Sequence, residues 1–294
     1  MKFGITPISF DIIDESFDLK NLNYPFLIQR AIDAGYKHIE LTMDLEYILP
    51  GTISRRVIKK LLKIKEETGI TYSVHLPIWS IELSSPNALI RNASINCMIE
   101  SIKRSEPLDP IAYVIHLTGA LSAEISRINL DPNAKESIIG LLNGIASSSI
   151  KKILSNTDIS PQKIAVENVE FPFDATRKLV DKYNLSICFD TGHLLVGYSG
   201  NDTVQEFLEK HMDKIIEFHL NDGKIMANGR PNDHIAVGDG SFPMKVLEII
   251  KERGFEGPAV FELTLAAAEK SLHRIRQHYP DLVEKFECGD DISS

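Results

Sequence analysis

The stretch SRRVIKKLLKIKEETGITYSVHLP, residues 54–77, contains one complete structural unit of this chain. Its first part places apolar side chains at Val57, Leu61 and Ile64, the spacing that puts them on one face of an α-helix. Its last part, residues 71–77, is short and rich in β-branched and apolar side chains, as buried parallel strands are. The stretch therefore predicts a helix that is followed directly by a strand.

Helical patterns of this kind have recognisable ends. Ser54 is a candidate N-cap, because its side-chain oxygen can accept a hydrogen bond from a first-turn N–H group. Gly69 is a candidate stop, because glycine readily adopts the left-handed conformation that ends helices. Further helical patterns occupy residues 174–184, 202–214, 242–257 and 266–279, and the first two begin with an aspartate that could cap them.

The alternation of strands and helices extends over the whole chain of 294 residues. Eight strand-like runs occupy residues 2–9, 37–44, 71–77, 112–119, 163–170, 185–193, 214–222 and 258–264. This number of strands, each followed by a helical segment, predicts an α/β protein with a single (β/α)8 TIM barrel. We expect residues 1–294 to form one domain, with a tail from about residue 283 to 294.

A doubly wound open sheet is the competing architecture. Such a sheet usually has fewer strands, and a nucleotide-binding version carries a glycine-rich turn after its first strand. Here the first strand runs into PISFDIIDESF, residues 7–17, which contains no glycine. The barrel is therefore favoured.

The composition narrows the class of protein. The formal net charge of −9 argues against an extended nucleic-acid partner. Cys97, Cys188 and Cys288 are scattered and form no CxxC pair, so neither a disulfide framework nor a cysteine-based zinc site is expected. No secretory signal pattern and no apolar run of about 18 residues occur, which predicts a cytoplasmic protein without membrane contact. A homo-oligomer is compatible with the sequence.

Six consecutive predicted strands end near a histidine or a carboxylate. These residues are His75, His116, Glu167, Asp190, His193, His219 and Glu262. In a (β/α)8 barrel the carboxyl ends of the strands converge, so these side chains should meet at one rim. Any one of them alone could be an ordinary hydrogen-bonded group. Several carboxylates within apolar runs would each cost several kcal/mol without a counter-charge, so the set predicts bound cations.

The donor set indicates the kind of metal. Imidazole nitrogens combined with carboxylate oxygens suit zinc best, with manganese or cobalt as alternatives. The number of donors allows one to three ions, and two ions about 3.5–4 Å apart are typical of phosphoester hydrolysis. A single ion held by Glu167, Asp190, His219 and Glu262 is the simpler alternative.

Five motifs carry a family resemblance. They are VHLPIWSIELSSPN (74–87), YVIHLTG (113–119), CFDTGH (188–193), HLNDGK (219–224) and DHIAVGDG (233–240). With them the chain resembles, over essentially its whole length, the xylose isomerase-like TIM barrel superfamily, which includes the endonuclease IV family (AP endonuclease family 2). That superfamily also contains sugar isomerases, epimerases and dehydratases.

The resemblance implies a division of the ligands among three ions. His75 and His116 would hold one ion, which Glu167 would bridge to a second ion held by Asp190, His219 and Glu262, and His193 and His234 would hold a third. The family pattern has an aspartate two residues before the last histidine. This chain has Asn232 there, with Asp233 adjacent, so its third site departs from the pattern.

The first functional hypothesis is a divalent-metal-dependent phosphoester or phosphodiester hydrolase, which would use metal-activated water. Its substrate would be small or cofactor-like, such as a nucleotide- or cobamide-like compound. We expect Glu167, Glu262 and His193 to be catalytic, with Glu167 orienting the nucleophile and His193 on the leaving-group side. Trp79, Asp222 and Asn232 are the predicted substrate contacts.

Two other hypotheses stay open. One is a single-metal sugar or sugar-phosphate isomerase or epimerase, or a related dehydratase, in which Glu167 and Glu262 would move protons. The other is a binding protein that retains a degenerate site. The number of metal ions bound per chain distinguishes the three hypotheses. One ion favours isomerisation, two or three ions favour hydrolysis, and no bound ion favours a binding protein.

Overall fold

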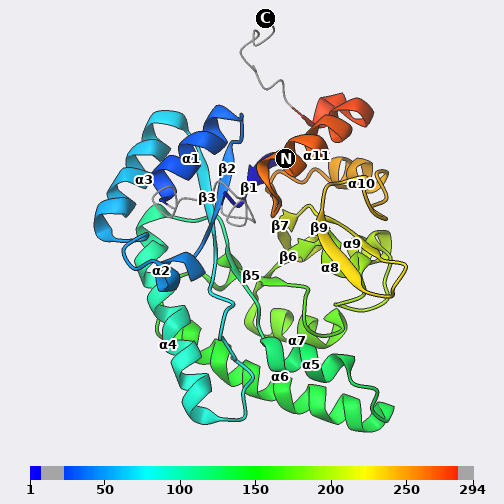
Figure 1. Cartoon of the computed structure of the whole chain (residues 1–294). Helices are drawn as coiled ribbons and strands as arrows, with labels where there is room; N and C mark the ends of the chain where they lie inside the picture. The colour runs from blue at the N-terminus through cyan, green and yellow to red at the C-terminus, as the bar shows by residue number, and fades with distance from the viewer. Residues whose placement is uncertain (8–22, 284–294) are drawn as a thin grey trace, which may run out of the picture.

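Eight parallel strands close into a barrel, as the sequence predicts, in the order β1-β10-β7-β6-β5-β4-β3-β2. Figure 1 shows helices around the strands. The computed structural model describes residues 1–7 and 23–283. The barrel strands are β1 (Lys2–Ile5), β2 (His38–Thr42), β3 (Thr71–His75), β4 (Tyr113–Ile115), β5 (Ile164–Glu167), β6 (Ser186–Asp190), β7 (Ile215–His219) and β10 (Pro258–Phe261). Because β1 pairs with both β2 and β10, this sheet has no open edge.

Helices surround the barrel. They are α1 (Tyr24–Asp33), α2 (Asp44–Ile48), α3 (Arg55–Thr68), α4 (Ala88–Ser105), α5 (Ala120–Arg127), α6 (Pro132–Ser155), α7 (Phe173–Tyr183), α8 (Thr191–Leu195), α9 (Val204–His211), α10 (Val246–Glu252) and α11 (Leu265–His278). Short 3-10 turns occupy Glu106–Leu108, Pro161–Lys163, Met212–Lys214 and Pro280–Leu282. In the described part of the chain, no helix is both long and apolar enough to cross a membrane.

Local sequence signals explain where several helices begin and end. The side chain of Ser54 accepts a hydrogen bond from the backbone N–H of Val57, and Gly69 ends α3 with a φ of 72°, as predicted. The aspartate caps predicted for the next helices are wrong. Pro172 precedes α7 without a side-chain cap, and Thr203 caps α9 through a reciprocal pair of hydrogen bonds with Glu206.

The strands are buried on both faces, which is why their sequences are almost continuously apolar. Cys188 lies within this buried sheet and is a free thiol, as is Cys97. Cys288, residues 284–294 of the predicted tail and the end of the first predicted strand lie outside the described residues.

A two-stranded hairpin outside the barrel was not predicted. Its strands are β8 (Asp222–Ile225) and β9 (Pro231–Ile235). Lys224 pairs with Asn232 and Asp222 with Ile235, so two residues of β9, Asp233 and His234, lie opposite one residue of β8. This is a β-bulge, and within it His234 adopts a φ of 53°. The bulge interrupts the regular alternation of side chains along β9.

Candidate metal centre

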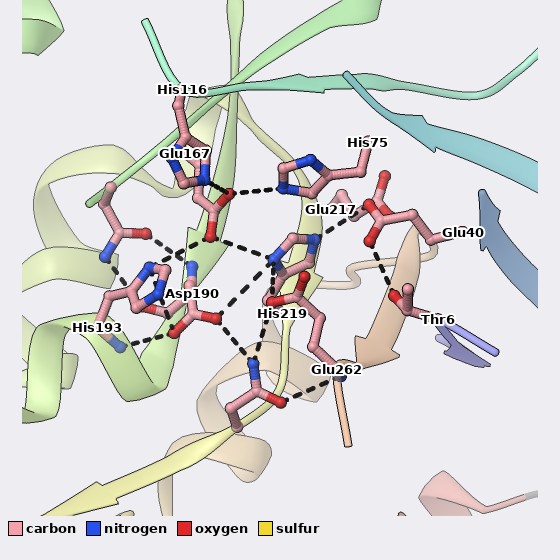
Figure 2. A network of polar contacts seen from close by, with 12 residues as sticks. Thr6, Glu40, His75, His116, Glu167, Asp190, His193, Glu217, His219 and Glu262 are labelled. Atoms are coloured by element: carbon pink, nitrogen blue, oxygen red, sulfur yellow. Dashed lines mark hydrogen bonds and ion pairs between the residues drawn. The ribbon is translucent and has the colours of Figure 1, made fainter. Parts of the chain in front are cut away.

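Glu167 lies at the centre of the cluster that the barrel brings together (Figure 2). Its Oε2 atom is 3.1 Å from Nε2 of His75 and 2.9 Å from Nε2 of His116. Its Oε1 atom is 3.2 Å from Nδ1 of His193 and 3.3 Å from Nδ1 of His219. One carboxylate from β5 therefore faces imidazoles that follow or end four different strands.

Glu262 closes the other side of the cluster. Its Oε2 atom is 3.0 Å from Nδ1 of His219 and 3.1 Å from Nε2 of His234. Oδ2 of Asp190 lies 3.8 Å from the first of these nitrogens and 3.9 Å from the second. Glu167, His219 and Glu262 thus converge on one region, which the prediction of a shared metal centre requires.

Among the described residues, these donors fall into groups whose ligand atoms all lie within 4.8 Å of one another. Three groups occupy the mouth of the barrel: His75, His116 and Glu167; Glu167, Asp190, His219 and Glu262; and Asp190, His193 and His234. Glu167 and Asp190 each belong to two of them. A fourth group, Glu40, Glu217 and His219, lies in the barrel interior.

The spacing of the donors fits bound metal ions. Two ligand atoms that each lie about 2.1 Å from an ion are about 3.0–3.4 Å apart at ordinary coordination angles. The contacts between Glu167 and its histidines span 2.9 to 3.3 Å. Nδ1 of His193 and Nδ1 of His219 are buried and form no hydrogen bond within the described chain, although both face carboxylate oxygens. Such buried nitrogens are suited to coordinate a cation.

Hydrogen bonds on the far side of each ring determine which nitrogen faces the centre. Nε2 of His219 lies 3.1 Å from Oε2 of Glu40, whose other oxygen accepts a hydrogen bond from Thr6 (Figure 2). Nδ1 of His116 lies 3.0 Å from Oε1 of Glu170. A carboxylate in this position takes the N–H of the ring and leaves the other nitrogen unprotonated towards the metal.

Glu40 and Glu170 were not predicted from the sequence. Glu40 is fully buried and lies in the middle of β2, whereas the prediction considered the carboxyl ends of strands. A charged residue inside the apolar run HIELT was the available signal. Glu170 follows β5 at a distance of three residues from Glu167, where it looks like an ordinary loop carboxylate.

Charge interactions within the cluster shift the pKa values of its residues in the direction opposite to the shift that burial causes. Burial alone would lower the pKa of His75, but its hydrogen bond to Glu167 and the charge of Glu40 raise that pKa to about 9. Burial likewise favours a neutral Glu167, yet the surrounding histidines, His116 and His219 foremost, hold its pKa well below the ordinary value. Without a metal ion, protons on the histidines therefore balance the carboxylates.

Two asparagines orient Asp190, and neither was singled out in the sequence. Nδ2 of Asn221 donates to Oδ2 of Asp190 at 2.8 Å. Asn168 exchanges two hydrogen bonds with the backbone of Asp190, at 2.6 and 2.9 Å. The remaining carboxylate oxygen of Asp190 accepts from the backbone N–H of His193 and caps α8. The capping interaction thus places Asp190 and His193 side by side.

Asp222 has a different role from the predicted substrate contact. It is fully buried, and its carboxylate accepts four backbone N–H groups, at distances of 2.7 to 2.9 Å. The donors are Gly223, Gly238, Gly240 and Phe242. Both oxygens are therefore engaged in shaping the segment that follows β9.

The bulge in β9 gives Asn232 and Asp233 different surroundings. Asn232 pairs across the hairpin with Lys224, and its contact with substrate stays a prediction. Oδ2 of Asp233 instead lies 3.6 Å from Nε2 of His193 and 3.4 Å from Nδ1 of His234. Burial would raise the pKa of Asp233, but these two histidines lower it. Asp233 thus contacts both histidines of the third group.

Trp79 follows β3 and is 63% exposed. The backbone N–H groups of Ile78 and Trp79 donate to the carboxylate of Asp44, which fastens this loop to α2. The indole therefore projects from an anchored backbone. Its contact with substrate stays a prediction.

The closed parallel barrel thus carries candidate metal ligands at the carboxyl ends of its strands, where TIM barrels have their active sites. The chain belongs to the xylose isomerase-like TIM barrel family, whose sequence profile matches residues 28–278. Endonuclease IV-like enzymes and sugar isomerases and epimerases belong to the same superfamily.

Relatives identified by sequence include an uncharacterized protein and several probable endonucleases. The uncharacterized protein, from Methanocaldococcus jannaschii, is 26% identical over 93% of this chain and 92% of its own length. A probable endonuclease 4 of Mycoplasmoides gallisepticum is 28% identical, over 59% of this chain and 57% of that protein. The alignment with this second relative therefore spans little more than half of each protein.

Solved structures share the fold at low sequence identity. A D-tagatose 3-epimerase-like protein superposes with a TM-score of 0.70 at 21% identity, over 96% of this chain and 98% of that one. Endonuclease IV from Thermus thermophilus superposes with a TM-score of 0.68 at 13% identity, over 96% of this chain and 100% of that one. The two similar scores show that the fold alone does not separate the two chemistries.

Proposed function

We propose that this protein is a divalent-metal-dependent phosphoester or phosphodiester hydrolase. The observation that carries the proposal is the presence of three overlapping ligand groups that share Glu167 and Asp190. A single-ion enzyme needs only the four-residue group. The other four histidines of the mouth would then be surplus ligands. Three of them, His75, His116 and His193, face Glu167, and His234 faces Glu262.

The substrate class follows from charge. Bound cations would attract a small phosphorylated compound to an otherwise acidic mouth. The net charge of −9 does not suit an extended nucleic acid. A nucleotide- or cobamide-like phosphoester is the class that fits best.

The position of each residue in the cluster indicates its role in the proposed reaction. When bound, divalent ions lower the pKa of water and neutralise charge that develops on a phosphoester. Glu167 stays ionised between its histidines, so it orients groups at the centre and does not donate a proton. His193 and His234 lie together beside Asp233, where they would hold a third ion on the leaving-group side. Glu262 holds His219 and His234 in place.

The test combines metal counting with kinetics. We expect the purified protein to contain two or three ions per chain, preferably zinc, and to hydrolyse bis(p-nitrophenyl) phosphate. Glu167→Gln should lower kcat at least about 100-fold with an unchanged far-UV spectrum, since it weakens the residue that two groups share. Glu100→Gln, an exposed change on α4, is the matched control. One ion per chain together with no hydrolysis of any phosphoester would refute the proposal.

A sugar isomerase or epimerase is the second candidate. It is favoured by the completeness of the four-residue group, in which Glu167 and Glu262 flank His219. In that case one ion suffices, and the two glutamates move a proton next to a ketose carbonyl. Solvent-deuterium exchange into ketohexoses at one ion per chain would favour this candidate over hydrolysis.

A further inference from the structure

Arg127 ends α5, and the Tyr198 ring connects its guanidinium to the candidate metal centre. Its guanidinium carbon lies 4.7 Å from the centre of the Tyr198 ring. That ring lies 5.8 Å from the His193 ring, and the backbone N–H of Tyr198 donates to the carbonyl oxygen of His193. Arg127 is therefore two contacts away from a candidate ligand of the third group.

Unlike several other arginines, Arg127 has no carboxylate partner among the described residues. The guanidinium of Arg274 contacts Asp239 at 2.8 Å, and that of Arg177 contacts Asp181 at 2.9 Å. Arg127 is exposed and forms no ion pair with any residue that the structure describes. Stacking on a tyrosine occupies the face of the guanidinium and leaves its N–H edge free to bind an oxyanion.

The stack places Arg127 on the side of the mouth that carries the third group. The Tyr198 ring contacts the Arg127 guanidinium and lies 5.8 Å from the His193 ring. The positive charge of Arg127 therefore lies near the third group, where a leaving group would depart.

We propose that Arg127 binds a second phosphate group of the substrate, adjacent to the phosphate that reacts at the metal centre. The inference rests on the proposed hydrolase function and narrows its substrate class to compounds with two phosphate groups. A guanidinium can hold such a phosphate with two parallel N–H···O hydrogen bonds. The Tyr198 ring positions the Arg127 guanidinium.

Isothermal titration of the zinc-loaded protein tests the inference. The probes are adenosine 3′,5′-bisphosphate and adenosine 5′-monophosphate. We expect the bisphosphate to bind at least about tenfold more tightly than the monophosphate, as a charged hydrogen-bonded contact provides. Arg127→Gln should reduce this ratio to near one while leaving metal content and monophosphate affinity unchanged. Arg56→Gln, an exposed change on α3, should keep the wild-type ratio.

Further variants separate charge from geometry. Arg127→Lys should give an intermediate ratio, because it keeps the charge but loses the planar pair of donors. Tyr198→Phe should retain the ratio and Tyr198→Leu should lower it. An unchanged ratio in Arg127→Gln, or a loss of bound metal in that variant, would overturn the inference and leave the hydrolase proposal standing. If neither nucleotide binds and no phosphoester is hydrolysed, both fail.

Discussion

At the scale of single residues, the site depends on side chains that stand behind or beside the ligands. Glu40 lies behind His219 and determines which ring nitrogen faces the centre. Asp233 reaches the third group only because the bulge in β9 turns it there. The sequence motifs contain the candidate ligands, but they do not reveal the roles of these two residues.

Glu40→Gln should weaken metal binding about 10- to 100-fold, the usual effect of removing a carboxylate behind a ligand histidine. The neutral amide accepts the ring N–H less strongly and so holds His219 less firmly. Competition against a fluorescent zinc chelator measures the change, with Glu100→Gln as the exposed control. An unchanged zinc affinity would show that Glu40 does not orient His219.

Asp233→Asn should reduce the number of bound ions by one, because it removes the carboxylate that contacts His193 and His234. Asn232→Ala is the matched control, since Asn232 lies on the same strand and pairs with Lys224 across the hairpin. Elemental analysis after dialysis measures both variants. The reverse pattern, with loss of an ion in Asn232→Ala alone, would contradict the placement of the bulge.

Metal binding should tighten as the pH rises. The pKa of His75 is raised to about 9 in the metal-free cluster, so this ring is protonated at pH 7 and must release its proton to bind a cation. We expect zinc affinity to increase between about pH 6 and about pH 9. Calorimetric titrations in buffers of different ionisation enthalpy measure the released protons. Zinc binding without proton release at pH 7 would contradict this assignment.

At the scale of elements, the hairpin and the segment after it depend on one buried carboxylate. Asp222 begins β8 and accepts backbone N–H groups from Gly238, Gly240 and Phe242. An added Cβ atom at Gly240 would overlap Oδ1 of Asp222, so the close approach requires glycine there. The hairpin in turn carries Asp233 and His234 to the mouth.

Asp222→Ala should destabilise the protein by at least about 3 kcal/mol, since it leaves four backbone N–H groups without their acceptor, two of them in the buried residues Gly223 and Phe242. Asp239→Asn is the control. Asp239 contacts Lys270 and Arg274 near the surface, where an ion pair contributes about 1 kcal/mol or less. Urea unfolding measures both changes. Equal stabilities of the two variants would show that Asp222 does not organise the segment.

At the scale of the whole molecule, closure of the barrel concentrates buried charge. Several strands and the segments that follow them deliver carboxylates and histidines to one buried region, so bound cations would stabilise the folded state in which those groups meet (Figure 2). The unfolded chain separates the ligands and binds cations weakly. Metal binding and folding should therefore be linked.

Zinc should raise the melting temperature of the chelator-treated protein. At a zinc concentration about 1,000-fold above the dissociation constant, the stabilisation is about 4 kcal/mol, or roughly 5–10 °C for a domain of this size. Differential scanning calorimetry with and without zinc measures the shift. Magnesium, which prefers oxygen ligands, is the control and should have a smaller effect. Identical melting temperatures in all three conditions would exclude a metal site linked to folding.

The sequence alone determined the barrel and most of the side chains that meet in the candidate metal centre. Alternating strand and helix patterns identify the fold, because each element buries a characteristic face, and the rule that strand ends converge predicts which residues meet. His75, His116, Glu167 and Glu262 could be chosen in this way. Local signals also determined the ends of α3 at Ser54 and Gly69.

Only the tertiary structure decided the contacts between distant residues. Glu40 and His219 are 179 positions apart, and no local pattern relates a mid-strand glutamate to a particular ring nitrogen. Asp233 contacts His193 and His234 because of a bulge in β9. The bulge shifts the register by one residue and reverses the side-chain direction that regular alternation along a strand predicts. Chain periodicity specifies elements and faces, whereas the orientation of a hydrogen bond is determined only when the sheet closes.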